Sequence, residues 1–529
     1  MGRRLAAFER AGSSDRFALA LASHAPSLET AELAAFVVLN RKSLLGEREA
    51  ELLSLARSAE AAEVRRIAAE LLVARRDLAA AFRRLLFGDG GEVAEAAFQT
   101  VTGRVDTLER DLAVADPGYR APRDVTAAEV AAALPAGAAL IDYTLFRPSD
   151  FPTRTWADNA HIGAVVLRPG ADAVFVDLGA LAALQPAIDN LSATLGGGDR
   201  GAIAGFTLYR ALMGPLAKHL DGAETLFVSP AGPLGLIPFD MLRTSLAASG
   251  TTLRLLATGR ALVAEAPKRV GVGLVVFGAV DYGQAGGSTP SAERPEVTQL
   301  ALVEQARGSV VKTLIRSGGL QEFGPLPQTA VELDAIAQIW REAGGPAPAL
   351  YFGAEAQEGR LTSLPAPPRV LHLATHGFVL ETETAATRAA LLTGVALAGA
   401  NRVADAAADA DGVLFGYEIE GLNLTGTELV VVSACDTGRG QTNATEGIYN
   451  LARAFRLAGA GAVLVTLKPV DDALAAASMT DFYEAWLGTP GTTPAEALAR
   501  TKRAWAQSPN QRQNRPDTWA AFVLIENRL

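Results

Sequence analysis

The chain has 529 residues, of which 49% are hydrophobic and 20% charged, and its formal net charge is −10. This length favours two or three domains, the balance argues against a disordered chain, and the acidic charge gives no footprint for nucleic acid or anionic lipid. There is no run of the roughly 18 apolar residues that a membrane-spanning helix needs, no signal peptide is apparent, and the single cysteine excludes an internal disulfide, so we expect a cytoplasmic, bacterial protein.

Residues 1–118 have the pattern of helices. Apolar side chains recur every three or four residues from Ile67 to Leu85, and again from Val101 to Leu112. The glycine-rich stretch 88–91 separates the two runs and predicts a turn. We therefore expect an all-helical hairpin or short bundle, TPR-like or regulatory, although no fixed repeat period marks a solenoid.

From residue 125 the sequence pattern changes to short apolar runs that alternate with helical patterns. The predicted strands are 138–145, 162–167, 173–178, 225–229, 272–277, 370–374, 429–433, 462–467 and 519–525. The predicted helices between them are 329–340, 446–457 and one that starts at the capping box Thr493-Pro-Ala-Glu496. Strands separated by helices predict an α/β fold, with a parallel or mixed sheet covered by helices on both faces.

Two reactive side chains follow predicted strands. His376 follows strand 370–374, and Cys435 follows strand 429–433, which is apolar without alternation as in a buried central strand. The carboxyl ends of parallel strands meet at one edge of a sheet, where active sites form. The histidine precedes the cysteine by about 60 residues, close to the roughly 50 residues of caspase-type peptidases.

These residue types suit nucleophilic catalysis. A free thiol is mostly protonated at neutral pH, so Cys435 needs an imidazole such as His376 to accept its proton. The same imidazole can then protonate a leaving amine. The backbone N–H groups of Gly377 and Cys435 are candidates for an oxyanion hole, since glycine permits close approach of a substrate carbonyl.

An ordered series of motifs resembles the CHAT domain, the bacterial branch of the caspase/separase-type cysteine peptidases. The matching stretches are 228–239, Leu-His-Leu-Ala-Thr-His-Gly-Phe at 371–378, 391–401, 411–424, Val-Ser-Ala-Cys-Asp-Thr-Gly at 432–438, 446–455, 458–462, 470–472 and 519–524.

The resemblance implies a caspase-like αβα sandwich with an inactive caspase-like half over 125–262 and a catalytic half over 265–529. It also implies that His376 and Cys435 form the catalytic dyad of a cysteine endopeptidase. Relatives of this kind act in programmed cell death and phage defence.

In the related separases an aspartate after the next strand lies in the pocket for a basic substrate residue. Asp472 matches that position best, and Asp471 is adjacent. Many relatives have tryptophan where this chain has Lys468, which would either partly neutralise the pocket or point to solvent. Either aspartate is also explained as the N-cap of the following helix.

Three interpretations remain open at this point: a constitutive peptidase, a peptidase triggered by a protein partner that binds the N-terminal helices, and a non-catalytic scaffold in signalling. The expected partners are a protein substrate and such an activator. The sequence contains no zinc-binding motif and no phosphate-binding loop, so we expect no cofactor and no metal.

Overall fold

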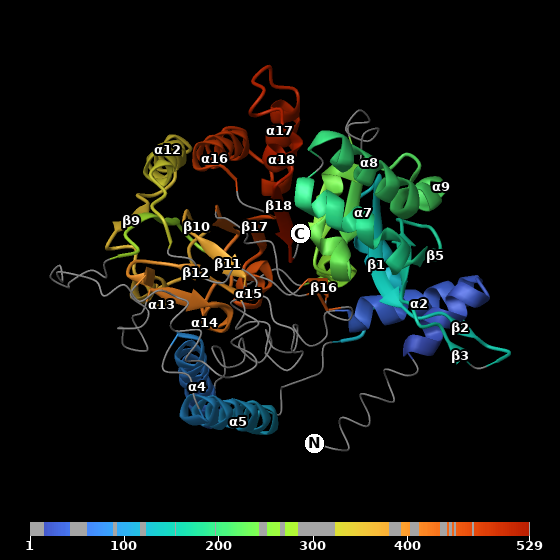
Figure 1. Cartoon of the computed structure of the whole chain (residues 1–529), viewed down its shortest axis with the longest axis horizontal. Coiled ribbons are helices and arrows are strands. Elements are labelled where there is room, and N and C mark those ends of the chain that lie inside the picture. Colours follow the sequence, from blue (N-terminus) through green and yellow to red (C-terminus); the bar gives the residue numbers. More distant parts are fainter. Residues whose placement is uncertain are drawn as a thin grey trace.

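The computed structural model shows one large mixed sheet at the centre of the protein (Figure 1). It describes residues 15–42, 61–87, 92–116, 123–153, 155–195, 197–242, 251–264, 270–283, 323–379, 393–401, 412–433, 442–443, 447–448, 451–467 and 470–527. The strand order is β5-β4-β1-β6-β7-β18-β17-β14-β10-β8-β9. These strands are β1 (Ala138–Phe146), β4 (His161–Leu167), β5 (Val174–Ala180), β6 (Thr225–Ser229), β7 (Thr252–Leu256), β8 (Leu274–Val280), β9 (Ala349–Gly353), β10 (Val370–Leu373), β14 (Leu429–Val432), β17 (Ala462–Thr466) and β18 (Phe522–Glu526).

The sheet contains two parallel blocks that meet at its middle, and β4 and β5 extend the first block as antiparallel strands. Strands β1, β6, β7 and β18 are parallel neighbours, and β17, β14, β10, β8 and β9 form the second parallel series. The blocks join where β18 pairs with β17 in antiparallel fashion. We call strands β5 to β7 the first half of the sheet and strands β18 to β9 the second half.

Helices cover both faces of the second half. On β14 the side chains alternate: Leu429 and Val431 pack on one face, and Val430 and Val432 on the other. The first face is covered by α12 (Gln328–Glu342), α16 (Asp472–Leu487) and α17 (Pro494–Ala506), and the second by α14 (Gly416–Glu420) and α15 (Leu451–Leu457). Because both faces are covered, β14 is apolar throughout.

The first half of the sheet is built in the same way. Leu140 faces a cluster formed with α2 (Leu28–Arg41) and α6 (Ala127–Ala133). Its neighbour Ile141 faces the opposite cluster, formed with α7 (Leu181–Thr194) and α8 (Gly198–Leu208). The smaller elements are β2 (Ser149–Asp150), β3 (Thr155–Trp156), β11 (Gly377–Val379), β12 (Thr393–Ala396), β13 (Val413–Phe415), β15 (Thr442–Asn443), β16 (Gly447–Ile448), α9 (Ala217–Leu220), α13 (Glu358–Thr362), α18 (Pro516–Trp519) and short 3-10 and π turns.

Two long N-terminal helices form an antiparallel hairpin below the second half of the sheet (Figure 1). They are α4 (Ala62–Phe87) and α5 (Glu92–Ala115), and α4 also contacts α14. Arg75 on α4 is buried; its guanidinium lies 3.2 Å from the carboxylate of Glu109 on α5 and 3.8 Å from that of Glu420 on α14. A buried arginine thus connects the hairpin to the body of the protein.

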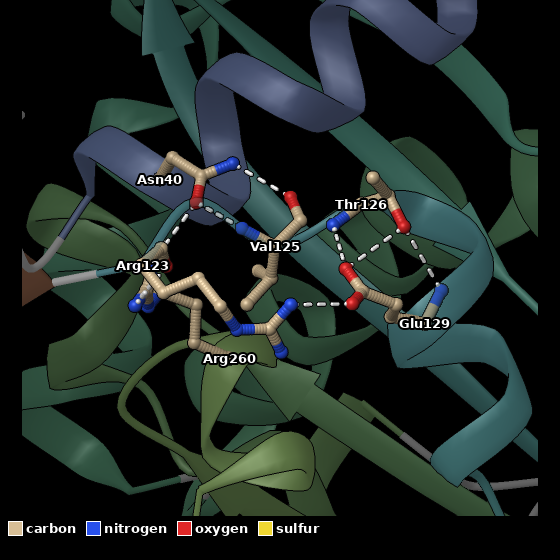
Figure 2. A network of polar contacts seen from close by, with 6 residues as sticks. All are labelled: Asn40, Arg123, Val125, Thr126, Glu129 and Arg260. Atoms are coloured by element: carbon tan, nitrogen blue, oxygen red, sulfur yellow. Dashed lines mark hydrogen bonds and ion pairs between the residues drawn. The ribbon is translucent and has the colours of Figure 1, made fainter.

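Helix α2 is fixed to the first half of the sheet by its last turn. The side-chain amide of Asn40 donates to the carbonyl of Val125 at 2.8 Å and accepts from the N–H of Val125 at 2.8 Å (Figure 2). Arg260 donates to the same Asn40 oxygen at 2.7 Å. This paired contact satisfies buried backbone groups of the segment that leads into α6, as burial requires.

The residue after α2, Lys42, is fully buried. Its ammonium donates to Asp142 at 2.6 Å, and to the carbonyl and hydroxyl of Ser229 at 2.9 and 2.5 Å. Burial lowers the pKa of Lys42, and the carboxylate of Asp142 opposes that shift. Asp142 also accepts from the N–H of Gly259 at 2.8 Å, so this ion pair connects α2 with the sheet and the turn after β7.

The predicted α/β fold, with a sheet between two layers of helices and a helical N-terminal region, is confirmed. Strands β7 and β9 were not predicted, and the helix predicted from residue 446 begins at Leu451 after the short strand β16. The last strand starts at Phe522 because Pro516–Trp519 forms a helical turn.

The division into three domains stays a prediction. Among the described helices, none combines the length and the apolar character needed to cross a bilayer.

We predict that Lys42→Met lowers the free energy of unfolding by about 3–5 kcal/mol, because it leaves the buried carboxylate of Asp142 without its counter-ion. Denaturant titration measures this change. The matched control is the double variant Lys42→Met/Asp142→Asn, which removes both charges but keeps an oxygen that accepts from Gly259. It should recover most of the loss. A single variant as stable as the wild type would contradict the prediction.

Candidate active site

The site begins where β10 leaves the sheet. After Leu373 the chain turns through Thr375 to His376 and enters β11. The buried hydroxyl of Thr375 donates to the carbonyl of Ala396 on β12, and lies 3.0 Å from the hydroxyl of Tyr282. The N–H of Ala396 donates to the carbonyl of His376 at 2.8 Å. The backbone of His376 is therefore fixed from β12 on one side.

The imidazole of His376 is fixed by a backbone carbonyl. Its Nε2 lies 2.8 Å from the carbonyl oxygen of Gly324. A carbonyl only accepts, so Nε2 carries the proton in this contact and Nδ1 is the other nitrogen of the ring. The rings of Tyr282 and Phe323 lie against the imidazole, with centroids 5.2 and 5.6 Å away.

Burial is the main influence on the pKa of His376 and lowers it, because the charged imidazolium loses hydration. The hydrogen bond to Gly324 and the negative charge of Asp472 act in the opposite direction. The imidazole is thereby favoured in its neutral form, which is the form that can accept a proton.

Strand β14 leads to the cysteine. Cys435 and Lys468 lie outside the described residues, so the structure describes the path to the cysteine and not the side chain. Strands β10 and β14 are parallel neighbours, with Leu373 opposite Val432. The N–H of Ser433 continues the ladder by donating to the carbonyl of Leu373 at 3.0 Å. In sequence, His376 comes as many residues after Leu373 as Cys435 comes after Val432, the residue paired with Leu373.

Gly377 opens strand β11, opposite Val395. Antiparallel strands alternate between hydrogen-bonded and non-bonded pairs. The bond from the N–H of Ala396 to His376 assigns the preceding pair to the bonded class. The N–H of Gly377 therefore points away from β12, at the edge of the three-stranded sheet β11-β12-β13.

The two candidate pocket aspartates lie at the start of α16. Asp471 is the N-cap, accepting from the N–H of Leu474 at 3.2 Å, and it forms an ion pair with Arg512 at 3.3 Å. Asp472 accepts from the N–H of Gln328 at 2.8 Å. Burial raises the pKa of the Asp472 carboxyl, Glu332 and Asp471 raise it further, and the bond from Gln328 and the charge of His376 lower it.

A second histidine lies deeper on the same strand. His372 is buried, with Nδ1 3.1 Å from the hydroxyl of Tyr483 on α16 and Nε2 3.0 Å from the carboxylate of Glu332 on α12. Both ring nitrogens are occupied, which assigns His372 a structural role. It ties β10 to the helices that cover this face.

Three contacts of His376 were not expected from the sequence. Gly324 and Phe323 belong to a loop far upstream, and Tyr282 follows β8. No motif marks them, because a backbone carbonyl and ring packing leave no residue-type pattern. In the described part of the chain, no group of three histidine, cysteine, aspartate or glutamate residues is arranged to hold a metal ion.

Comparison with known families decides the assignment. The CHAT domain model matches residues 203–527. The chain belongs to the CHAT domain family. The motif series in the sequence predicted this membership, and with it the caspase-like sandwich preceded by helices. No curated protein matches the chain.

Two of the solved structures that resemble the chain are those of gingipain R and of a separase–securin complex. The Arg-specific cysteine proteinase gingipain R is 9% identical, with a TM-score of 0.33 over 65% of this chain and 74% of the gingipain chain. The Saccharomyces cerevisiae separase–securin complex at 3.0 Å is also 9% identical, with a TM-score of 0.43 over 82% of this chain and 34% of that chain. The CHAT protein therefore spans about a third of the separase length.

We predict that Asp472→Asn lowers the pKa of His376. The carboxylate favours the imidazolium, and asparagine removes the charge while retaining an oxygen for Gln328. Titration of the His376 ring signals by NMR measures the change. Asp471→Asn is the control, since it removes a neighbouring charge from the helix cap, and it should shift the titration less. An unchanged His376 titration in Asp472→Asn would contradict the electrostatic account.

Proposed function

We propose that this CHAT protein is a cysteine endopeptidase that uses His376 and Cys435 as its dyad. The observation that carries the proposal is the hydrogen bond from His376 Nε2 to Gly324, at the end of the strand that pairs with the strand leading to Cys435. That bond leaves Nδ1 to serve the thiol. Family membership supports the same chemistry.

The proposed reaction has two stages. In the first, Nδ1 of His376 takes the thiol proton, and the Cys435 sulfur bonds to the carbonyl carbon of the scissile peptide. The N–H groups of Gly377 and Cys435 stabilise the oxyanion. The C–N bond then breaks, and the imidazolium gives its proton to the leaving amine, which leaves a thioester.

In the second stage water replaces the amine. His376 takes a proton from the water, the hydroxide oxygen bonds to the thioester carbon, and the C–S bond breaks. The acid product leaves, and the thiol regains its proton. No cofactor takes part in this scheme, because the imidazole accepts and returns the proton in each stage.

Asp472 is the proposed contact for a basic substrate residue. Its carboxylate is partly exposed, and it is close enough to His376 for each to influence the pKa of the other. A guanidinium would pair with it through charge-assisted hydrogen bonds. Asp471 is less suited to this role, since it caps α16 and pairs with Arg512.

We further propose that activity is triggered by a protein partner that binds the N-terminal helices. The support is the packing of α4 on α14 through Arg75 and Glu420, and the packing of α14 on α15. Helix α15 follows the segment that contains Cys435. A partner that moves the α4–α5 hairpin would therefore act, through α14, on the helix that follows the nucleophile in the chain.

We predict that Cys435→Ala reduces peptide cleavage by on the order of 10⁴-fold, because the nucleophile is lost, while the protein stays folded. Ser433→Ala, a change of similar size at the end of the same strand, should retain activity. A thiol-reactive peptide probe separates the alternatives. Labelling of Cys435, alone or after addition of a partner, supports the enzyme, whereas no labelling under any condition supports the non-catalytic scaffold.

We predict that Asp472→Ala removes a preference for arginine or lysine before the cleaved bond, because the carboxylate that would pair with the substrate is lost. A peptide-library cleavage profile measures this, with Asp471→Ala as the matched control. An Asp472→Ala profile identical to that of the wild type would place the specificity pocket elsewhere.

A further inference from the structure

We propose that Asn401 is a positioning residue for His376 and acts by holding residues 323–328, here called the strap, against the imidazole. The inference rests on the proposed function and deepens it, since it assigns the group that keeps the general base in place. Asn401 does not itself contact His376 among the described hydrogen bonds; it contacts the strap.

The strap consists of Phe323-Gly-Pro-Leu-Pro-Gln328. The carbonyl of Gly324 accepts from Nε2 of His376, and the ring of Phe323 lies beside the imidazole. Both features belong to adjacent residues at one end of the strap. The place of that end therefore fixes both the orientation of the imidazole and its exposure to water.

Asn401 holds this end through a pair of hydrogen bonds. Its side-chain oxygen accepts from the N–H of Phe323 at 2.9 Å, and its side-chain nitrogen donates to the carbonyl of Phe323 at 3.1 Å. Its own N–H donates to the carbonyl of Tyr282 at 2.9 Å. One residue thus fixes the two aromatic residues that lie against His376.

The middle of the strap is held by Thr329, whose N–H and hydroxyl donate to the carbonyl of Leu326 at 3.2 and 2.6 Å. Pro325 and Pro327 have no N–H, so the strap offers few backbone donors of its own. Its other end is held by Asp472, which accepts from Gln328, at the start of α12. Gly324 follows Phe323 directly, so a displacement of Phe323 also moves the carbonyl that accepts from His376.

The titratable groups around the imidazole come from three elements. Asp472 on α16 acts on His376 directly, Glu332 on α12 acts on Asp472, and the hydroxyl of Tyr282 contacts Thr375 beside the histidine. None of these groups is changed by a substitution at Asn401. A shift of the His376 titration in an Asn401 variant would therefore report the place of the strap.

The test is Asn401→Leu, studied by NMR titration of His376 without substrate and by steady-state kinetics. Without the two hydrogen bonds between Asn401 and Phe323, the strap can move and water can reach the imidazole. The pKa of His376 should then rise toward the ordinary histidine value, because burial is the largest cause of its depression. We expect kcat to fall about 10- to 100-fold, as misplacement of a catalytic group does, with little change in KM.

The chain offers a matched control in Asn40, which makes the same two-bond contact with Val125 in the segment that leads into α6 (Figure 2). Asn40→Leu should lose comparable stability but leave the His376 titration and kcat unchanged. Asn401→Ser keeps a short polar side chain at this position and adds no charge, so it should weaken the hold on Phe323 and give an intermediate shift. It also serves as the test if Asn401→Leu does not fold.

A His376 titration in both Asn401 variants that matches the wild type would overturn the proposal. So would a rise in kcat, which would make the strap an inhibitory cover. If the titration moves as expected but the wild-type protein neither cleaves peptides nor labels with the probe, the positioning by Asn401 stands and the peptidase assignment fails.

Discussion

The parallel pairing of β10 with β14 is the constraint on which the rest of the site depends. Leu373 lies opposite Val432, and both strands are buried on both faces. A one-residue slip of β10 would turn His372 away from Tyr483 and Glu332, so these buried hydrogen bonds help to fix the register. The fixed register in turn places Ser433, which follows β14, and His376, which follows β10, at the same edge of the sheet. His376 is thus positioned by buried contacts that lie outside the proposed site.

Once placed, His376 is governed by groups from distant parts of the chain. Gly324 supplies the acceptor for Nε2, Asp472 supplies a charge, and Asn401 fixes the strap that carries Gly324. Burial and the carboxylate have opposite effects on its pKa. In the proposed reaction, a low pKa would keep the imidazole ready to accept a proton, and the carboxylate would stabilise the charged imidazolium after the transfer.

The sequence predicted the parts of this site that have a local pattern. Apolar runs predicted β10 and β14, since strands buried on both faces need few polar side chains, and the motif series predicted the family. The strap was not predicted, because a carbonyl contact depends on where a loop lies and not on which residue contributes it. Strand β9 was missed as well, since its short apolar run lacks a clear signal. Asn401 lay within a matched stretch, but its partner Phe323 is set by tertiary structure alone.

The same type of asparagine contact with the backbone occurs beside each half of the sheet. Asn40 and Asn401 each pair with both backbone groups of one distant residue, so each replaces two hydrogen bonds that a strand would otherwise supply. An isolated loop has no ladder of its own, and its buried backbone groups need such partners. In the first half the contact fixes the segment that leads into α6, whereas in the second half the fixed segment carries the acceptor for His376. The two asparagines thus make the same contact and differ in the segment they hold: only the segment held by Asn401 contacts His376.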